Sequence, residues 1–221
     1  MYFVIEGVIG VGKTTLARLL QPSFESNLLL EVFEENPFLS DFYGDRERYA
    51  FQTQIFFLLS RYHQQKEGVK RFLSEDRHII SDYTFDKDAL FAKVNLRGDE
   101  LETYFRVQEA LKEKIHQPDL IVYLRASTST LMERIALRDR PYERSMERAY
   151  IEELNQAYDE FFITEAAKHP VDILTIDSNR LDYVRNVEDL HWIENRIRQS
   201  LQLSPFQPEL PIPDHQDTAQ S

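Results

Sequence analysis

A glycine-rich segment near the N-terminus constrains the fold of this chain more than any other feature. It reads Gly7-Val8-Ile9-Gly10-Val11-Gly12-Lys13-Thr14 and fills every fixed position of the pattern G-x-x-x-x-G-K-[ST]. An apolar run (Met1–Ile5) precedes it, and apolar residues at helical spacing follow it at Leu16, Leu19 and Leu20. A strand, a glycine-rich turn and a helix in this order surround a phosphate with backbone N–H groups and a helix N-terminus. The segment therefore predicts nucleotide binding.

The same segment assigns roles to individual side chains. We expect the ammonium of Lys13 to reach the β- and γ-phosphates of ATP, and the hydroxyl of Thr14 to ligate Mg²⁺. A chance glycine-rich turn is a poor alternative, because the fixed residues coincide with the correct flanks. The residues expected to contact the nucleotide are Gly7, Val8, Ile9, Gly10, Val11, Gly12, Lys13, Thr14 and Thr15.

Composition narrows the classes of partner. The chain has 221 residues and a formal net charge of −12, which argues against a nucleic-acid polymer because such binders present a basic stripe. The lack of cysteine excludes disulfides and thiolate metal sites, and no apolar run approaches the roughly 20 residues that span a bilayer. Because the loop begins at Gly7, we expect no signal peptide. We therefore expect a soluble, cytoplasmic protein with a small-molecule partner and no membrane contact.

Apolar runs of strand length alternate with helix-like stretches along the chain. The expected strands are Tyr2–Ile5, Leu28–Val32, His78–Ser81, Leu120–Leu124 and Asp172–Ile176. The longer expected helices are Arg46–Leu73, Glu100–Ile115, Thr128–Leu137, Met146–Lys168 and Val187–Leu201, and Asn36 with Pro37 is typical of a helix N-terminus. This alternation predicts an α/β protein of the P-loop kinase fold, with a five-stranded parallel sheet covered by helices on both faces.

The domain is expected to span residues 1–203. From Ser204 the chain is rich in proline, glutamine and aspartate. Such a segment buries too little apolar surface to order itself, so residues 204–221 are expected to form a disordered tail.

The first group of chemically suggestive residues follows the second expected strand. Glu31 is the last position of that strand that faces the crevice, at the edge where parallel sheets bind ligands. A carboxylate there can accept the proton of a substrate hydroxyl, and we assign this role to Glu31. For the neighbouring Glu34 and Glu35, a solvated loop and helix N-terminus is the better interpretation.

The second group lies on the long helix from Arg46. Gln54 and Arg61 are seven residues apart and share one helix face, and Tyr43 lies just before the helix. A glutamine offers both a donor and an acceptor to the edge of a nucleobase. On spacing alone, however, solvated side chains are the commoner explanation.

The third group follows the third expected strand. Asp82 comes directly after this buried strand, which is the usual place for a carboxylate linked to Mg²⁺, and Asp88 follows six residues later. The alternative is that Asp82 caps a helix.

The fourth group joins two expected helices. Arg134, Arg138, Arg140 and Glu143 lie close together in sequence and are typical of an arginine-rich lid that closes on phosphates. An exposed basic turn at a helix C-terminus is the alternative.

Together these segments resemble the deoxyribonucleoside kinases, and most closely the bacterial deoxyadenosine/deoxyguanosine kinases. The resemblance extends from Met1 to about Gln202. The matching runs are Glu6–Thr15, Glu31–Leu39, Phe51–Gln54 with Ser60-Arg61, Asp82–Asp88, Tyr123–Ala126 and Arg134–Glu143.

The resemblance implies roles for the acceptor-side residues. Glu31 matches the general base and Gln54 the glutamine that binds the nucleobase. By the same resemblance, Arg61 supports base recognition with Asp88 as partner. Tyr43 and Glu143 match the residues that bind the sugar 3′-hydroxyl, and Arg134, Arg138 and Arg140 match the lid arginines.

The chain departs from the family pattern at two positions. Glu31 is followed by Val32 rather than proline. The family sequence Asp/Glu-Arg-Ser becomes Asp82-Tyr83-Thr84, so the arginine that sits near the 5′-hydroxyl is missing. A tyrosine here is more typical of the deoxyguanosine kinase branch, which favours a purine deoxynucleoside as substrate.

Two other functions are alternatives for a chain with this loop, a nucleoside monophosphate kinase and a nucleotide-binding switch. A nucleoside monophosphate kinase similar to thymidylate kinase has the same fold, but Glu31 would repel the phosphate of its acceptor. A P-loop nucleotide-binding switch would need a guanine-reading run such as Asn-Lys-x-Asp, which the sequence lacks. The resemblance also implies a homodimer, for which the apolar helix Arg46–Leu73 could supply the contact face.

Overall fold

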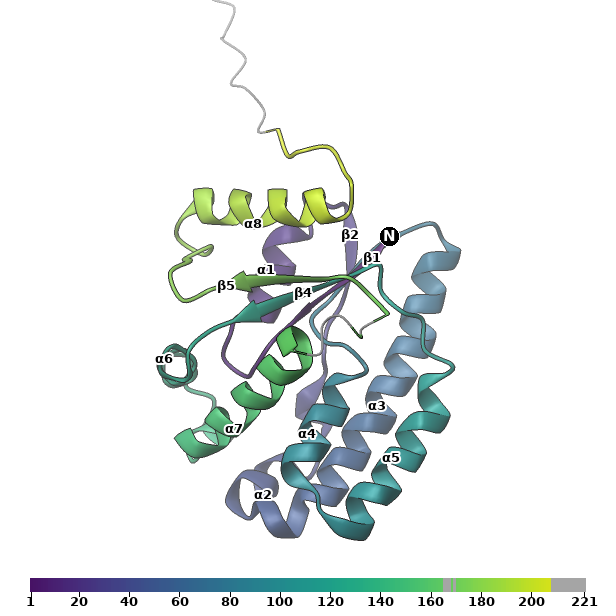
Figure 1. The fold of residues 1–221 in the computed structure, drawn as a ribbon, viewed down its shortest axis with the longest axis vertical. Helices are drawn as coiled ribbons and strands as arrows, with labels where there is room; N and C mark the ends of the chain where they lie inside the picture. The colour runs from purple at the N-terminus through teal and green to yellow at the C-terminus, as the bar shows by residue number, and fades with distance from the viewer. Residues whose placement is uncertain (165–167, 169, 208–221) are drawn as a thin grey trace, which may run out of the picture.

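An entirely parallel five-stranded sheet runs through the centre of the computed structural model (Figure 1). The structure describes residues 1–164, 168 and 170–207. In spatial order β2-β3-β1-β4-β5, the strands are β2 (Ser26–Leu29), β3 (His78–Ser81), β1 (Tyr2–Glu6), β4 (Leu120–Arg125) and β5 (Ile173–Asp177). The predicted five-stranded parallel sheet is confirmed.

Helices cover both faces of the sheet. Figure 1 shows α1 and α8 on one side, and α3, α4, α5 and α7 on the other. The α-helices are α1 (Lys13–Leu20), α2 (Leu39–Gly44), α3 (Arg46–Ser74), α4 (Lys87–Asn95), α5 (Gly98–Lys112), α6 (Thr128–Arg138), α7 (Arg148–Asp159) and α8 (Val187–Ser200). Shorter turns are the 3₁₀ helices η1 (Phe33–Glu35) and η2 (Pro141–Glu143) and the π-helical turn η3 (Glu160–Thr164).

The central strand β1 shows why the strands read as continuous apolar runs. All of its residues are buried. Tyr2 and Val4 belong to one apolar cluster with Val69 of α3, whereas Phe3 belongs to another with Leu16 of α1. Because successive side chains of a strand point to opposite faces, a sheet covered on both sides needs apolar residues at every position.

Several element boundaries differ from those expected. The strand predicted at Leu28–Val32 is observed at Ser26–Leu29, so Glu31 lies two residues beyond the strand rather than at its end. Asn36 does not begin a helix. Its side-chain oxygen accepts a hydrogen bond from the backbone N–H of Phe38 (3.0 Å), and α2 begins at Leu39.

The C-terminal part also differs in detail. The helix predicted at Met146–Lys168 begins at Arg148 and passes at Glu160 into the π-helical turn. Residues 165–167 of that prediction lie outside the described residues, as do residues 208–221 of the predicted tail. None of the helices in the described part of the chain has both the length and the apolar character that crossing a bilayer requires.

The phosphate-binding loop joins β1 to α1 as predicted. Gly7 and Gly12 both have positive φ, at 150° and 105°. A Cβ atom on Gly7 would lie 2.5 Å from the carbonyl oxygen of Leu124, and one on Gly12 would lie 2.1 Å from the hydroxyl oxygen of Tyr183. The loop can therefore adopt this conformation only with glycine at these positions.

A buried carboxylate at the end of β1 connects this loop to its neighbours. Glu6 accepts hydrogen bonds from the backbone N–H of Gly7 (2.9 Å) and from that of Thr84 (2.8 Å), which follows β3. It also accepts from the hydroxyl groups of Thr84 (3.1 Å) and of Tyr158 in α7 (3.3 Å). One side chain thus sets the distance between the loops that follow β1 and β3.

We predict that Gly12→Ala weakens the binding of ATP by about tenfold or more, because the strained backbone costs on the order of 1–3 kcal/mol. Gly44→Ala is the matched control, since a Cβ there would meet no atom within 4 Å. Titration with a non-hydrolysable ATP analogue measures both affinities. An unchanged affinity for Gly12→Ala would contradict the prediction.

Candidate active site

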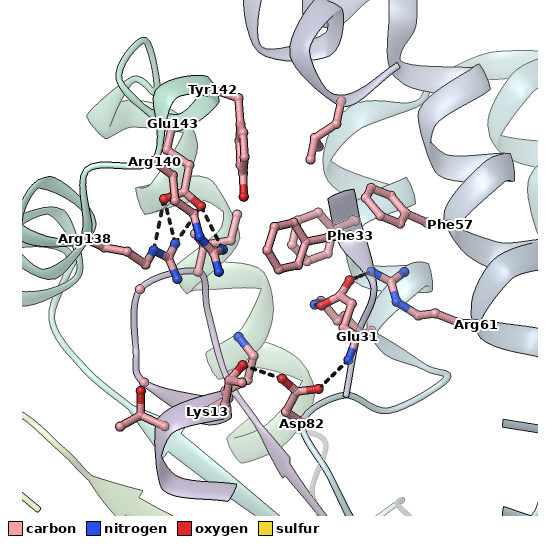
Figure 2. A pocket seen from close by; sticks show the side chains of 18 of the residues that line it. Lys13, Glu31, Phe33, Phe57, Arg61, Asp82, Arg138, Arg140, Tyr142 and Glu143 are labelled. Atoms are coloured by element: carbon pink, nitrogen blue, oxygen red, sulfur yellow. Dashed lines mark hydrogen bonds and ion pairs between the residues drawn. The ribbon is translucent and has the colours of Figure 1, made fainter. Parts of the chain in front are cut away.

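A cavity of about 370 Å³ opens at the carboxyl edge of the sheet. Its walls come from the phosphate-binding loop, the segment after β2, α3, the start of α4 and the turn before α7 (Figure 2). The predicted site residues that line it are Gly10, Gly12, Lys13, Thr14, Thr15, Ile9, Glu31, Tyr43, Gln54, Arg61, Asp82, Arg138, Arg140 and Glu143. The structure thus brings together most of the residues that the sequence selected.

Glu31 is held by charged partners from two helices. Arg61 of α3 forms an ion pair with Glu31 and a second one with Asp88, which is fully buried in α4. Burial alone would raise the pKa of the Glu31 carboxyl, but Arg61 and Lys87 together lower it below its ordinary value. The cavity therefore contains an ionised carboxylate, and the predicted pairing of Arg61 with Asp88 is confirmed.

Lys87 is a site residue that the sequence analysis missed. Its ammonium lies 2.5 Å from a carboxylate oxygen of Glu31, and its side chain is only 6% exposed. The signal available in the sequence was a lysine within the short segment Asp82–Asp88, where a family arginine is missing.

At the bottom of the cavity in Figure 2, Asp82 lies beside the phosphate-binding loop. One of its oxygens accepts a hydrogen bond from the Thr14 hydroxyl, and the other accepts from the backbone N–H of Glu31 (2.8 Å). Asp82 does not cap a helix, because α4 begins only at Lys87. A hydroxyl and a carboxylate oxygen side by side are a donor set that fits Mg²⁺.

Lys13 folds back over its own loop. Its ammonium donates to the carbonyl oxygens of Gly7 (2.6 Å) and Val8 (3.2 Å). Burial, and next the positive charge of Lys87, lower the pKa of Lys13 to about 8. The charges of Lys13 and Lys87 therefore lie close enough to each other to interact within the cavity.

Gln54 carries an unsatisfied polar atom. Its side chain is buried, and within the described structure its amide oxygen has no hydrogen-bond partner. Leaving such an atom unpaired costs roughly 1–3 kcal/mol, so this is a position at which a polar ligand is expected. Phe33, Phe57 and Tyr142 supply aromatic surface to the same cavity.

Tyr43 and Glu143 lie on the wall formed by α2 and η2. The ring of Tyr43 stacks on that of Tyr142, with centroids 6.2 Å apart and an angle of 13°. Burial, and next Tyr150 and Glu143, raise the pKa of the Tyr43 hydroxyl well above its ordinary value. The hydroxyl is therefore protonated and able to donate a hydrogen bond.

The buried Glu143 carboxylate binds the guanidinium groups of Arg138 and Arg140. The nearest atom pairs are 2.6 Å and 3.6 Å apart. The Arg140 guanidinium also lies 4.1 Å from the ring centre of Phe33, on the segment after β2. Both arginines line the cavity, as predicted, but closure of this segment as a lid stays a prediction.

Arg134 does not line the first cavity. It donates to the carbonyl oxygens of Val11 (3.1 Å) and Ser178 (2.8 Å), so it connects the phosphate-binding loop to the residue that follows β5. It lines a second hollow of about 650 Å³, together with residues 179–185. Arg138 lines both hollows, whereas Arg134 lines only the second, and the role of Arg134 as a lid arginine stays a prediction.

Comparisons with known proteins find similar chains over most of the sequence. A family model described as deoxynucleoside kinase matches residues 3–202. A deoxyguanosine kinase of Bacillus subtilis is 34% identical over 199 residues, covering 90% of this chain and 96% of that protein. A deoxyadenosine kinase of Dictyostelium discoideum is 36% identical over 165 residues, covering 72% and 66%. The solved structure of an M. mycoides deoxyadenosine kinase with bound dCTP matches with a TM-score of 0.77 at 28% identity, covering 90% of this chain and all of that one.

We predict that Asp88→Asn lowers the free energy of unfolding by about 3 kcal/mol, because it removes one partner of a buried ion pair. Asp86→Asn is the control: its partner Lys112 is 44% exposed, so the loss should stay below about 1 kcal/mol. Urea denaturation of both variants measures the difference. Equal losses would contradict the structural role assigned to Asp88.

Proposed function

The chain belongs to the deoxynucleoside kinase family, and on that premise we propose that it transfers the γ-phosphate of ATP to the 5′-hydroxyl of a purine deoxynucleoside. The family and the P-loop kinase fold are those that the sequence predicted, and the protein is an enzyme of this class. The observation that carries the proposal is an ionised Glu31 in the same cavity as the phosphate-binding loop. The names of the relatives, deoxyguanosine and deoxyadenosine kinase, support a purine.

The acceptor occupies the first cavity. The amide of Gln54 binds the edge of the base, with Phe33 and Phe57 against its faces. The hydroxyl of Tyr43 and the carboxylate of Glu143 bind the 3′-hydroxyl of the sugar. This orientation points the 5′-hydroxyl toward Glu31 and the phosphate-binding loop.

The donor occupies the loop of residues 7–15. Its triphosphate accepts hydrogen bonds from the loop N–H groups and from Lys13, and the rest of the nucleotide extends toward the hollow that Arg134 lines. Thr14 and Asp82 are the residues that would hold Mg²⁺, since they present adjacent oxygens beside Lys13. When bound, Mg²⁺ supplies positive charge to the β- and γ-phosphates.

The reaction is an in-line displacement at the γ-phosphorus. The 5′-hydroxyl loses its proton to Glu31 as its oxygen bonds to phosphorus, and the bond from phosphorus to the β–γ bridging oxygen breaks to release ADP. Lys13, Arg138 and Arg140 stabilise the charge on the transferred group. Closure of the segment 138–143 excludes water, which prevents hydrolysis of ATP.

The charge of Glu31 argues against one alternative function, and the family of the chain argues against the other. A nucleoside monophosphate acceptor would bring its phosphate against the negative charge of Glu31, so an uncharged nucleoside fits better. A nucleotide-binding switch without an acceptor is not retained, because the chain belongs to a family of enzymes.

Three further statements stay predictions: a cytoplasmic location, a role in nucleotide salvage and assembly as a homodimer. For the homodimer, α3 offers Leu59, which is 41% exposed, on the helix chosen from the sequence. We further propose that the enzyme acts on a small molecule and has neither a nucleic-acid polymer nor a membrane as its partner.

We predict that Glu31→Gln lowers kcat roughly 10²-fold or more, because the proton acceptor is lost, and leaves ATP affinity nearly intact, because Glu31 makes no contact with the donor in the proposed arrangement. Glu35→Gln is the matched control, since Glu35 is exposed on the same segment. Steady-state kinetics and titration with an ATP analogue separate the two effects. Near wild-type turnover of Glu31→Gln would refute the assigned role.

We predict that kcat/KM with ATP and Mg²⁺ is highest for deoxyguanosine or deoxyadenosine, lower for deoxycytidine and thymidine, and lowest for dTMP. Purine deoxynucleosides come first because the similar kinases are named for them, and dTMP comes last because Glu31 repels a phosphate. A steady-state screen of the five acceptors measures the order. Faster phosphorylation of dTMP than of any nucleoside would favour the monophosphate kinase instead.

A further inference from the structure

The position of Lys87 is unfavourable for stability. It is the first residue of α4, where the helix dipole disfavours a positive charge, and its side chain is nearly removed from water. Within the described structure its ion-pair partner is Glu31, and its ammonium lies 5.6 Å from the ring centre of Phe91. A buried ion pair contributes little net stability, so the placement points to a role in the cavity.

The backbone of Lys87 is anchored to the phosphate-binding loop. Its N–H donates to the hydroxyl oxygen of Thr84 (3.1 Å), and that hydroxyl donates to Glu6 (3.1 Å). Glu6 in turn accepts from the N–H of Gly7 (2.9 Å). The start of α4 is therefore positioned relative to the loop by a continuous set of buried hydrogen bonds.

Three other cations that line the cavity have carboxylate partners besides Glu31. Arg61 is paired with Asp88 as well as with Glu31, and Arg138 and Arg140 are both bound by Glu143. When Glu31 accepts the proton of the acceptor, Arg61 keeps a carboxylate partner. Lys87 then loses the carboxylate that balanced its charge, beside the oxygen that has just attacked phosphorus.

Tyr83 does not supply the missing charge. It occupies the family's arginine position, but its side chain is buried and its hydroxyl donates to Gln64 of α3 (2.9 Å). Lys87 enters the cavity four residues later in the same segment.

We propose that Lys87 is a catalytic residue of this kinase, whose ammonium orients Glu31 before the reaction and stabilises the transferred phosphoryl group as Glu31 becomes protonated. This inference rests on the proposed function. Lys87 thus supplies the positive charge near the 5′-hydroxyl that the family pattern would place at position 83. The proton balance is unchanged, because Lys87 stays protonated throughout and Glu31 takes the proton.

The test compares three variants of the full-length enzyme. Lys87→Met removes the charge and retains an unbranched side chain, Lys87→Arg keeps a charge, and Lys93→Met is the matched control at an exposed position of the same helix. For each variant we would measure kcat, KM, thermal stability and the affinity for a non-hydrolysable ATP analogue. Binding of aluminium fluoride in the presence of ADP, Mg²⁺ and deoxyguanosine would report on the transition state without turnover.

We expect Lys87→Met to lose roughly 10²–10³-fold in kcat and to bind aluminium fluoride far more weakly, because a charge that acts in the transition state is lost. Its affinity for the ATP analogue should change little, Lys87→Arg should recover most of kcat, and Lys93→Met should resemble the wild type. If Lys87→Met does not fold, Lys87→Gln replaces it under the same criteria.

Two results would overturn the proposal. One is a loss of less than tenfold in kcat for Lys87→Met. The other is an equal weakening of the ATP analogue and of aluminium fluoride, which indicates a purely structural role. Failure of the proposed function would be visible separately, as a wild-type enzyme that phosphorylates no deoxynucleoside.

Discussion

The site depends on a buried cluster of two carboxylates and two cations: Asp88, Arg61, Glu31 and Lys87. Each charge would be costly to bury alone, because removal from water penalises an unpaired ion by several kcal/mol. In the cluster the charges balance, and each carboxylate is held by a cation from another element. The cluster therefore fixes α3, α4 and the segment after β2 relative to one another around the cavity.

Two further carboxylates connect this cluster to the phosphate-binding loop. Asp82 binds the Thr14 hydroxyl and the backbone of Glu31, and Glu6 binds Gly7 and Thr84. The donor half and the acceptor half of the site therefore share a hydrogen-bond framework. Such a framework suits phosphoryl transfer, in which positioning and charge stabilisation provide most of the rate enhancement.

Sequence patterns predicted an element best where its buried side chains are apolar. β3 matches its predicted bounds, because Ile79 and Ile80 are both buried in an inner strand of a sheet covered on both faces. β2 is shifted, because it is an edge strand that starts with the polar pair Ser26 and Asn27. The helix α4 was not predicted, since its first turn buries Lys87 and Asp88 instead of the apolar side chains that mark a helix face.

The phosphate-binding loop and the parallel sheet could be predicted from local spacing and apolar periodicity. The family and the acceptor-side residues of the cavity were predicted from the resemblance of the sequence motifs to those of the deoxyribonucleoside kinases. The contact of Lys87 with Glu31 and the hydrogen bond of Arg134 to the carbonyl oxygen of Val11 followed only from the packing of the chain. The physical reason is that ion pairs between residues far apart in the chain depend on how helices pack, which local sequence does not encode. The orientation of a charged side chain such as that of Lys87 is therefore defined only in the folded protein, where its ion-pair partner has a fixed position.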